Sequence, residues 1–195
     1  MVDALCMAQT ARSSVIKAAN PSARNALEFG VTTARALRSC LGDAIPAYQL
    51  LAEGMRFEAR LAVDAFGFDI DDVFSLDDRL DDLGVEELPF ELEFDRFLTA
   101  LKETRFKRSN RFMFSLPRHV GTVRYATVED DVLERHARAY LASRAELMGR
   151  VRVRTALACR GRVTIVIGTH THRKDDLHVY RDFWTRSAHR PRSPR

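Results

Sequence analysis

Apolar residues in the first part of the chain recur at three- and four-residue spacing, the period of an α-helix with one buried face. Residues 3–19 contain no glycine or proline and predict a first helix. Proline suits the first position of a helix, and glycine commonly follows the last one. We therefore expect a second helix from Pro21 to just before Gly42.

Pro46 opens a third predicted helix, on which Arg56 and Arg60 share the polar side. Ser75 and the acidic residues after it predict the start of a short helix, because carboxylates are favoured at the positive end of the helix dipole. Residues 91–105 predict a further helix with phenylalanine and leucine on one side. The first half of the chain is thus predicted to be helical.

Farther along the chain the apolar period shortens to two, which indicates β-strands. Residues 111–116 and 120–125 predict a hairpin with its turn at Pro117 to His119. Residues 128–148 predict a long helix that a capping-box pattern opens. Further alternating segments predict an antiparallel sheet of three strands at residues 151–159, 163–167 and 177–183.

These elements predict an α+β protein: an N-terminal helical bundle, then a β-hairpin, a long helix and a three-stranded antiparallel sheet. We expect a helical domain over residues 1–105, which contains the acidic segment 64–98. A basic α+β region over residues 106–185 follows. Residues 186–195, with two prolines, four arginines and no acid, are expected to form a disordered basic tail.

Charge is unevenly distributed along the 195 residues. The formal net charge is only +4, yet residues 1–62 carry +2, residues 63–99 carry −11 and residues 100–195 carry +13. A contrast of this size exceeds what solubility requires and indicates a binding surface. Charge layout is therefore the strongest functional signal in the sequence.

Composition also bears on the compartment. No apolar run reaches the ~18–20 residues of a membrane span, which excludes an integral membrane protein and gives no reason to expect a membrane partner. The three cysteines are scattered and odd in number, unlike a secreted disulfide scaffold, and no basic segment precedes the first apolar run. We expect reduced thiols and a cytoplasmic location, with the nucleus as the alternative.

Basic residues of the C-terminal half predict the binding surface. Arg150, Arg152 and Arg154 alternate, so a β-strand would place them on one face, where they would neutralise successive phosphates. The predicted nucleic-acid-binding residues are Arg105, Lys107, Arg108, Arg111, Arg150, Arg152, Arg154, Arg160, Arg162, Arg173 and Lys174. A solvated face that the acidic segment balances is the simpler explanation of the same residues.

The resulting hypothesis is a non-enzymatic nucleic-acid-binding protein of packaging, coat-like or viral accessory type. RNA or a single strand is the favoured partner, because phenylalanines beside the basic residues can stack on unpaired bases. No sequence pattern assigns a catalytic residue, and we expect no cofactor. No zinc-finger spacing or glycine-rich phosphate loop is present.

The acidic segment offers a second hypothesis, a protein-interaction adaptor. Ten of the twelve phenylalanines lie between residues 57 and 114, and many of them neighbour carboxylates. Residues 64–98 would then dock a basic partner, or the basic region of a second copy, which gives a homo-oligomer through acidic-to-basic contacts. The simplest explanation of the paired aspartates in this segment is a solvated acidic surface.

Three histidines near the C-terminus are candidate metal ligands. His170 and His172 share a strand face, and His178 begins the next strand, so the three imidazoles would leave an open fourth position on zinc, as in a metal enzyme. The alternative is that these histidines bind no metal and simply cap the polar end of a strand. His136, on an apolar helical face, is expected to be a hydrogen-bonded core residue.

Overall fold

The computed structural model describes residues 2–19, 21–108 and 111–160. The chain divides into two compact units, Met1–Val153 and Arg154–Arg195. Of the second unit only residues 154–160 are described, as the last turns of a long helix.

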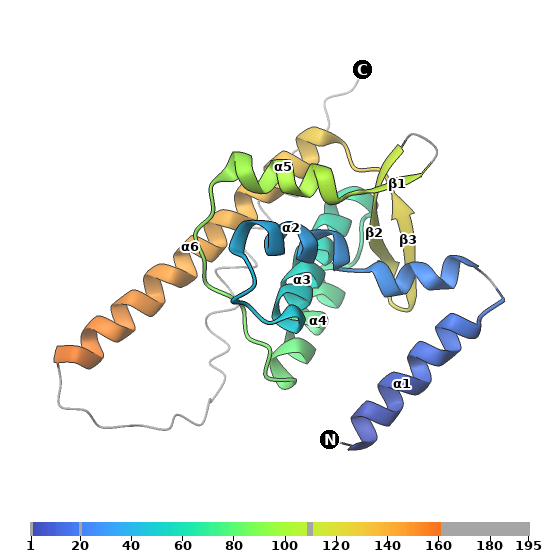
Figure 1. The fold of residues 1–195 in the computed structure, drawn as a ribbon, viewed down its shortest axis with the longest axis horizontal. Helices are drawn as coiled ribbons and strands as arrows, with labels where there is room; N and C mark the ends of the chain where they lie inside the picture. The colour runs from blue at the N-terminus through green and yellow to red at the C-terminus, as the bar shows by residue number, and fades with distance from the viewer. Residues whose placement is uncertain (1, 20, 109–110, 161–195) are drawn as a thin grey trace. The chain divides into compact units, whose positions relative to one another are not determined.

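Ten elements follow one another in the described residues (Figure 1). They are α1 (Val2–Lys17), the 3-10 helix η1 (Pro21–Glu28), α2 (Val31–Leu41), α3 (Ala47–Phe66), α4 (Ile70–Asp82), α5 (Phe94–Thr104), β1 (Phe106–Arg108), β2 (Arg111–His119), β3 (Thr122–Ala126) and α6 (Asp130–Arg160). The chain is helix-rich with one antiparallel sheet and a long helix, so the predicted α+β class is confirmed.

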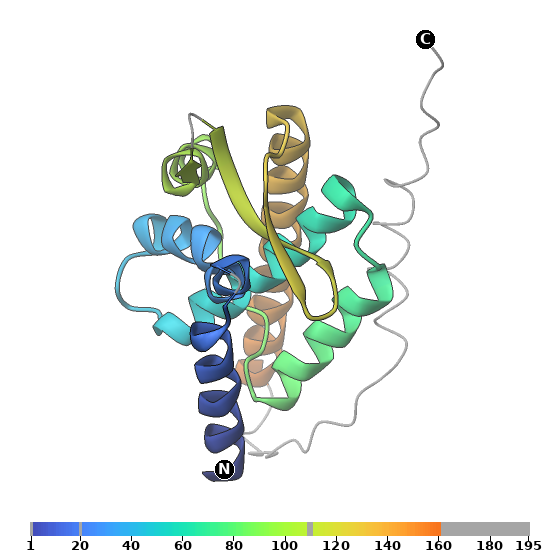
Figure 2. The same ribbon diagram turned by 90° about the vertical axis from the view of Figure 1, so that its right-hand side faces the viewer.

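Helix α3 forms the middle of the first unit, with α2 (light blue) and α4 (green) on opposite sides of it in Figure 2. Its inward side differs from the one that the apolar period predicts. Tyr48 is 61% exposed, whereas Glu53, Arg56 and Glu58 are completely buried. The predicted polar side of α3 therefore lies in the interior, where its charges need partners.

Two glycines let the backbones of α2 and α3 approach closely. Gly30, just before α2, has φ +82°, a conformation that other residues rarely adopt. A methyl group at Gly54 would overlap the carbonyl oxygen of Gly30, and one at Gly30 would lie 2.7 Å from Cγ of Met55. The crossing of the two helices thus requires glycine on both sides.

The sheet has the order β1-β2-β3, with antiparallel pairing throughout. Its β2–β3 turn falls at Gly121, which has φ +79°, and not at the predicted residues 117–119. Pro117 pairs with Val123 and lies beyond the three residues of β2 that pair with β1. A proline is tolerated there because β1 does not extend to it, so its missing N–H costs no bond to β1.

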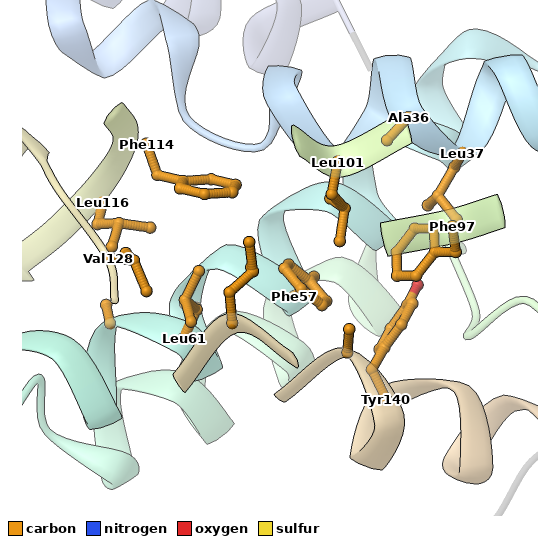
Figure 3. Close-up of a cluster of buried hydrophobic side chains, with 14 of the residues drawn as sticks. Ala36, Leu37, Phe57, Leu61, Phe97, Leu101, Phe114, Leu116, Val128 and Tyr140 are labelled. Atoms are coloured by element: carbon orange, nitrogen blue, oxygen red, sulfur yellow. The ribbon is translucent and has the colours of Figure 1, made fainter. Parts of the chain in front are cut away.

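Phe57 of α3 lies at the centre of the hydrophobic core (Figure 3). The ring centroids of Phe97 and Tyr140 lie 5.9 and 5.1 Å from that of Phe57, both edge-on, an arrangement that aromatic pairs favour. Phe114 of β2 joins the same cluster. One core therefore contains residues from both sides of residue 105, where a domain boundary is predicted and remains a prediction.

Helix α6 continues to Arg160, so residues 151–159 are helical and the predicted strand there is wrong. Extending an existing helix adds one hydrogen bond per residue, whereas a new strand needs a partner. The other two predicted strands, 163–167 and 177–183, and the tail 186–195 lie outside the described residues. Within the described ranges, no helix combines the length and apolarity that crossing a membrane demands.

Candidate functional site

Buried charges on α3 form an ion-pair network with α4, the segment after α4, and α6. We call it the arginine–carboxylate network. Three of its members are arginines, four are carboxylates and one is a tyrosine: Arg56, Arg60, Arg144, Glu53, Asp77, Asp81, Glu87 and Tyr140.

Glu53 connects α3 to α6. The Tyr140 hydroxyl donates a hydrogen bond of 2.6 Å to Glu53 Oε2, and Nε of Arg144 lies 2.9 Å from the same oxygen. The backbone N–H of Leu88 donates to Glu53 Oε1 at 3.0 Å. Burial, together with the negative charge of Glu53, raises the pKa of Tyr140 well above 10, so this hydroxyl stays protonated and donates.

The two arginines of α3 bind the acidic helix α4. Nη2 of Arg56 lies 2.9 Å from Asp81 Oδ1 and donates to the Val85 carbonyl at 2.7 Å. Arg60 contacts both carboxylate oxygens of Asp77, at 2.6 and 3.4 Å. Two donors on two oxygens give charge-assisted bonds with a fixed geometry. The solvated acidic surface proposed from the sequence is therefore, at these aspartates, an internal contact.

Glu87 and Arg144 complete the network. Nη1 of Arg144 lies 3.0 Å from Glu87 Oε1. Burial would raise the pKa of Glu87, but the charges of Arg144 and Arg60 outweigh it and hold this pKa below its ordinary value of 4.5. Sequence patterns assign no role to Arg144, because its partners are dozens of residues away and helical spacing shows only neighbours on one helix.

Glu58 is a second buried carboxyl group on α3 and caps the N-terminus of α2. The backbone N–H groups of Gly30 and Thr33 donate to its two oxygens at 2.6 and 3.0 Å, and the Thr33 hydroxyl donates at 3.0 Å. Burial nevertheless outweighs these donors and raises the pKa of Glu58 to about 8. The free N–H groups that open a helix thus receive their acceptor from another helix.

His136 is a core residue, as the apolar face around it predicts. It is 1% exposed, and its Nε2 lies 3.1 Å from the carbonyl oxygen of Phe57. Burial lowers the pKa of His136 to about 3, and the nearby charges of Arg60 and Arg135 act in the same direction. The imidazole is therefore neutral at physiological pH.

At the surface, cationic and aromatic side chains meet where α5 runs into the sheet. The Arg105 guanidinium carbon and the Lys107 Nζ lie 4.9 and 5.7 Å from the ring centroid of Phe112, which is 45% exposed. Arg111, one position before Phe112, is exposed, and Arg105 also contacts Asp130 at 3.1 Å. We call Arg105, Lys107, Arg111 and Phe112 the hairpin surface.

The other predicted nucleic-acid-binding residues do not join the hairpin surface as a group. Arg108 pairs with Arg111 through the backbone. Arg150 is exposed on α6, 20 residues beyond the Asp130 that Arg105 contacts, which corresponds to about 30 Å along a helix. Arg152, Arg154 and Arg160 follow on the same helix rather than on a strand face. Outside the described residues lie Arg162, Arg173 and Lys174, and the metal candidates His170, His172 and His178.

No known protein-family profile matches the chain, and no curated protein sequence does. Solved structures do. One is 2-deoxy-scyllo-inosose synthase in complex with carbaglucose-6-phosphate, NAD⁺ and Co²⁺: TM-score 0.50, 19% identity, 57% of this chain and 34% of that chain covered. Another is the 2-epi-5-epi-valiolone synthase ValA from Streptomyces hygroscopicus subsp. jinggangensis 5008, with NAD⁺ and Zn²⁺ bound: TM-score 0.52, 18% identity, 62% and 32% covered.

These likenesses correct the functional hypotheses. The chain shares part of its fold with enzymes, and it spans about a third of their length. The prediction of a non-enzymatic, RNA-binding protein of coat-like or viral accessory type is therefore wrong, and so are its nucleic-acid partner and the self-associating adaptor. The physical reason is that part of the −11 segment has its partners within the chain: Asp77 and Asp81 neutralise arginines of α3.

Proposed function

We propose that the chain is part of an enzyme that acts on a phosphorylated sugar, and that the hairpin surface holds the phosphate. The observation that carries this proposal is the fold shared with a synthase whose structure contains carbaglucose-6-phosphate. NAD⁺ is not assigned to the described residues. Dinucleotide sites of the Rossmann type need a parallel sheet with a glycine-rich turn, and the described sheet is antiparallel.

The chemistry of the hairpin surface suits such a ligand. Lys107 and Arg111 are exposed cations on paired strands, and a phosphate takes charge-assisted hydrogen bonds from both kinds of side chain. The exposed ring of Phe112, which is the partner of Lys107 across the two strands, offers an apolar face against which the C–H face of a sugar ring packs. Phe106 stacks on Tyr125 with a centroid distance of 4.7 Å, which fixes β1 in place.

Calorimetric titration of the full chain with glucose 6-phosphate, inorganic phosphate and glucose tests the proposal. We expect binding of glucose 6-phosphate that weakens with salt. The double variant Lys107→Ala/Arg111→Ala should bind about a hundredfold less tightly, at about tenfold per lost charge. Phe112→Ala should weaken the binding of glucose 6-phosphate but leave the binding of inorganic phosphate unchanged.

The control is Arg79→Ala, which removes one exposed charge from α4 and should leave binding unchanged. Absence of glucose 6-phosphate binding, or equal binding by the double variant and the control, would overturn the proposal. We further propose that the protein works in a reducing compartment, the cytoplasm or the nucleus. The buried thiol of Cys40, which forms no disulfide, supports this location.

A further inference from the structure

The two synthases with the shared fold contain Co²⁺ or Zn²⁺, so the described residues can be tested for a place that fits such an ion. Zinc takes three or four nitrogen, sulfur or oxygen ligands from the protein. Over residues 2–19, 21–108 and 111–160 no three His, Cys, Asp or Glu side chains gather closely enough to hold one.

Cations already surround the buried carboxylates. Arg144 lies 2.9 Å from Glu53 and 3.0 Å from Glu87, and the Tyr140 hydroxyl and the N–H of Leu88 bond the remaining positions of Glu53. Arg56 and Arg60 play the same part for the aspartates of α4. Three guanidinium groups thus face four carboxylates, and a divalent cation would have to displace them.

The buried histidine fits a metal no better. His136 Nε2, one of its two possible donor atoms to a metal, is bonded to the carbonyl oxygen of Phe57. Arg60 and Arg135 lie close enough to disfavour positive charge on the ring. On the other side of the ring, Nδ1 lies 3.9 Å from Oδ2 of Asp64. A metal at Nδ1 would thus have this one carboxylate near it, and the described residues bring no third ligand to the place, whereas zinc takes three or four.

We infer that the arginine–carboxylate network supplies the internal cations of this domain, so that its fold neither needs nor takes up Co²⁺ or Zn²⁺. If a metal ion displaced a guanidinium group, that group would be left as an uncompensated buried charge, which is strongly destabilising. The folded state therefore favours the arginines as the partners of these carboxylates. This inference goes beyond the proposed function and does not depend on it, because its test contains no sugar phosphate.

The test uses the full chain with His170→Ala, His172→Ala and His178→Ala, which removes the metal candidates outside the described residues. After dialysis against Zn²⁺ or Co²⁺ and then buffer, we expect no stoichiometric metal by mass spectrometry. We also expect the same thermal midpoint with and without EDTA. One retained equivalent that Glu53→Gln abolishes, or a midpoint that EDTA lowers, would overturn the inference.

A second measurement tests the guanidinium groups directly. Arg144→Met should lower the thermal midpoint by about 10 °C, because Glu53 and Glu87 lose their cation. Arg135→Met, which removes an exposed charge from the same helix, should leave the midpoint within about 2 °C. The thermal midpoint of Arg144→Lys, which keeps the charge, should lie between those of Arg144→Met and Arg135→Met. Equal midpoints for Arg144→Met and Arg135→Met would overturn the inference.

Discussion

At the scale of single residues, Glu58 illustrates how burial competes with hydrogen bonding. Three donors at the start of α2 favour the ionised carboxylate, but the cost of holding a charge in the interior is larger. The pKa of about 8 therefore lies well above the ordinary value of 4.5. The folded state binds a proton that the unfolded chain releases at lower pH, so folding and titration are linked.

This linkage predicts the effect of Glu58→Gln. The stability that the Glu58 proton confers is complete below pH 4.5 and declines as the pH rises toward 8. In urea unfolding at several pH values, the wild type should lose about 1.4 kcal/mol per pH unit relative to the variant over this range. A constant difference between the two proteins would show that Glu58 is not protonated in the folded state.

His136, Arg56 and Arg60 show which features of single residues can be predicted from the sequence and which cannot. The core role of His136 follows from its place on an apolar helical face, and the structure confirms it. The sequence places Arg56 and Arg60 on the polar side of a helix and so predicts them in water, because charged residues are rarely buried without partners. The structure buries both. Their partners are 17 to 25 residues away in α4, a separation at which no periodic pattern links them.

At the scale of elements, the contact between α2 and α3 depends on Gly54. We expect Gly54→Ala to destabilise the protein by about 2–4 kcal/mol, because the methyl group would overlap the carbonyl oxygen of Gly30 and push the helices apart. Separation would also weaken the Glu58 cap of α2. Denaturant unfolding measures the effect.

Gly149→Ala is the matched control for this prediction. Gly149 is helical and exposed on α6, and a methyl group there meets nothing within 4 Å. Alanine is favoured over glycine in a helix, so this variant should be more stable than the wild type by about 0.5–1 kcal/mol. Similar losses in both variants would contradict the tight crossing at Gly54.

Elements with punctuated ends are the ones that the sequence predicts well. Pro46 is the N-cap of α3, where the sequence predicts the start of that helix, and the β-hairpin forms over the predicted alternating residues, with its turn at Gly121. The strand predicted at residues 151–159 fails because arginine and valine alternate there within a helix that starts at Asp130. Extending a helix that is already formed is easier than starting a new strand, even where the apolar residues alternate.

At the scale of the whole molecule, the buried titratable groups set the pH range of stability. The folded pKa of His136, about 3, lies below its ordinary value of 6.5, so its contribution is present above pH 6.5 and is lost as the pH falls toward 3. The contribution of Glu58 to stability is instead lost as the pH rises from 4.5 to 8. The two slopes oppose each other between pH 4.5 and 6.5.

We therefore expect the difference in stability between the wild type and His136→Asn to shrink in acid. Asparagine keeps a polar group near the Phe57 carbonyl but does not titrate. Relative to this variant, the wild type should lose about 1.4 kcal/mol per pH unit between pH 6.5 and 3 in chemical unfolding. Parallel pH profiles would mean that His136 is protonated in the folded protein.

No sequence pattern predicts the partial fold that the chain shares with the two synthases. The identity is only 18–19%, which leaves few matching residues. The fold depends on buried pairs such as Tyr140 with Glu53, which pair across 87 residues. Charge totals describe segments and not pairs, so they do not indicate that acids of the segment 64–98 pair with Arg56, Arg60 and Arg144. These pairs are visible only in the three-dimensional structure.

The reach of the arginine–carboxylate network also has a consequence for synthesis on the ribosome. Helix α3 is made early, but the groups that Glu53 needs on α6 are made 87 and more residues later. Until Tyr140 and Arg144 leave the exit tunnel, burying α3 would leave Glu53 without its partners on α6. We therefore expect the nascent domain to bury α3 only after α6 has been made.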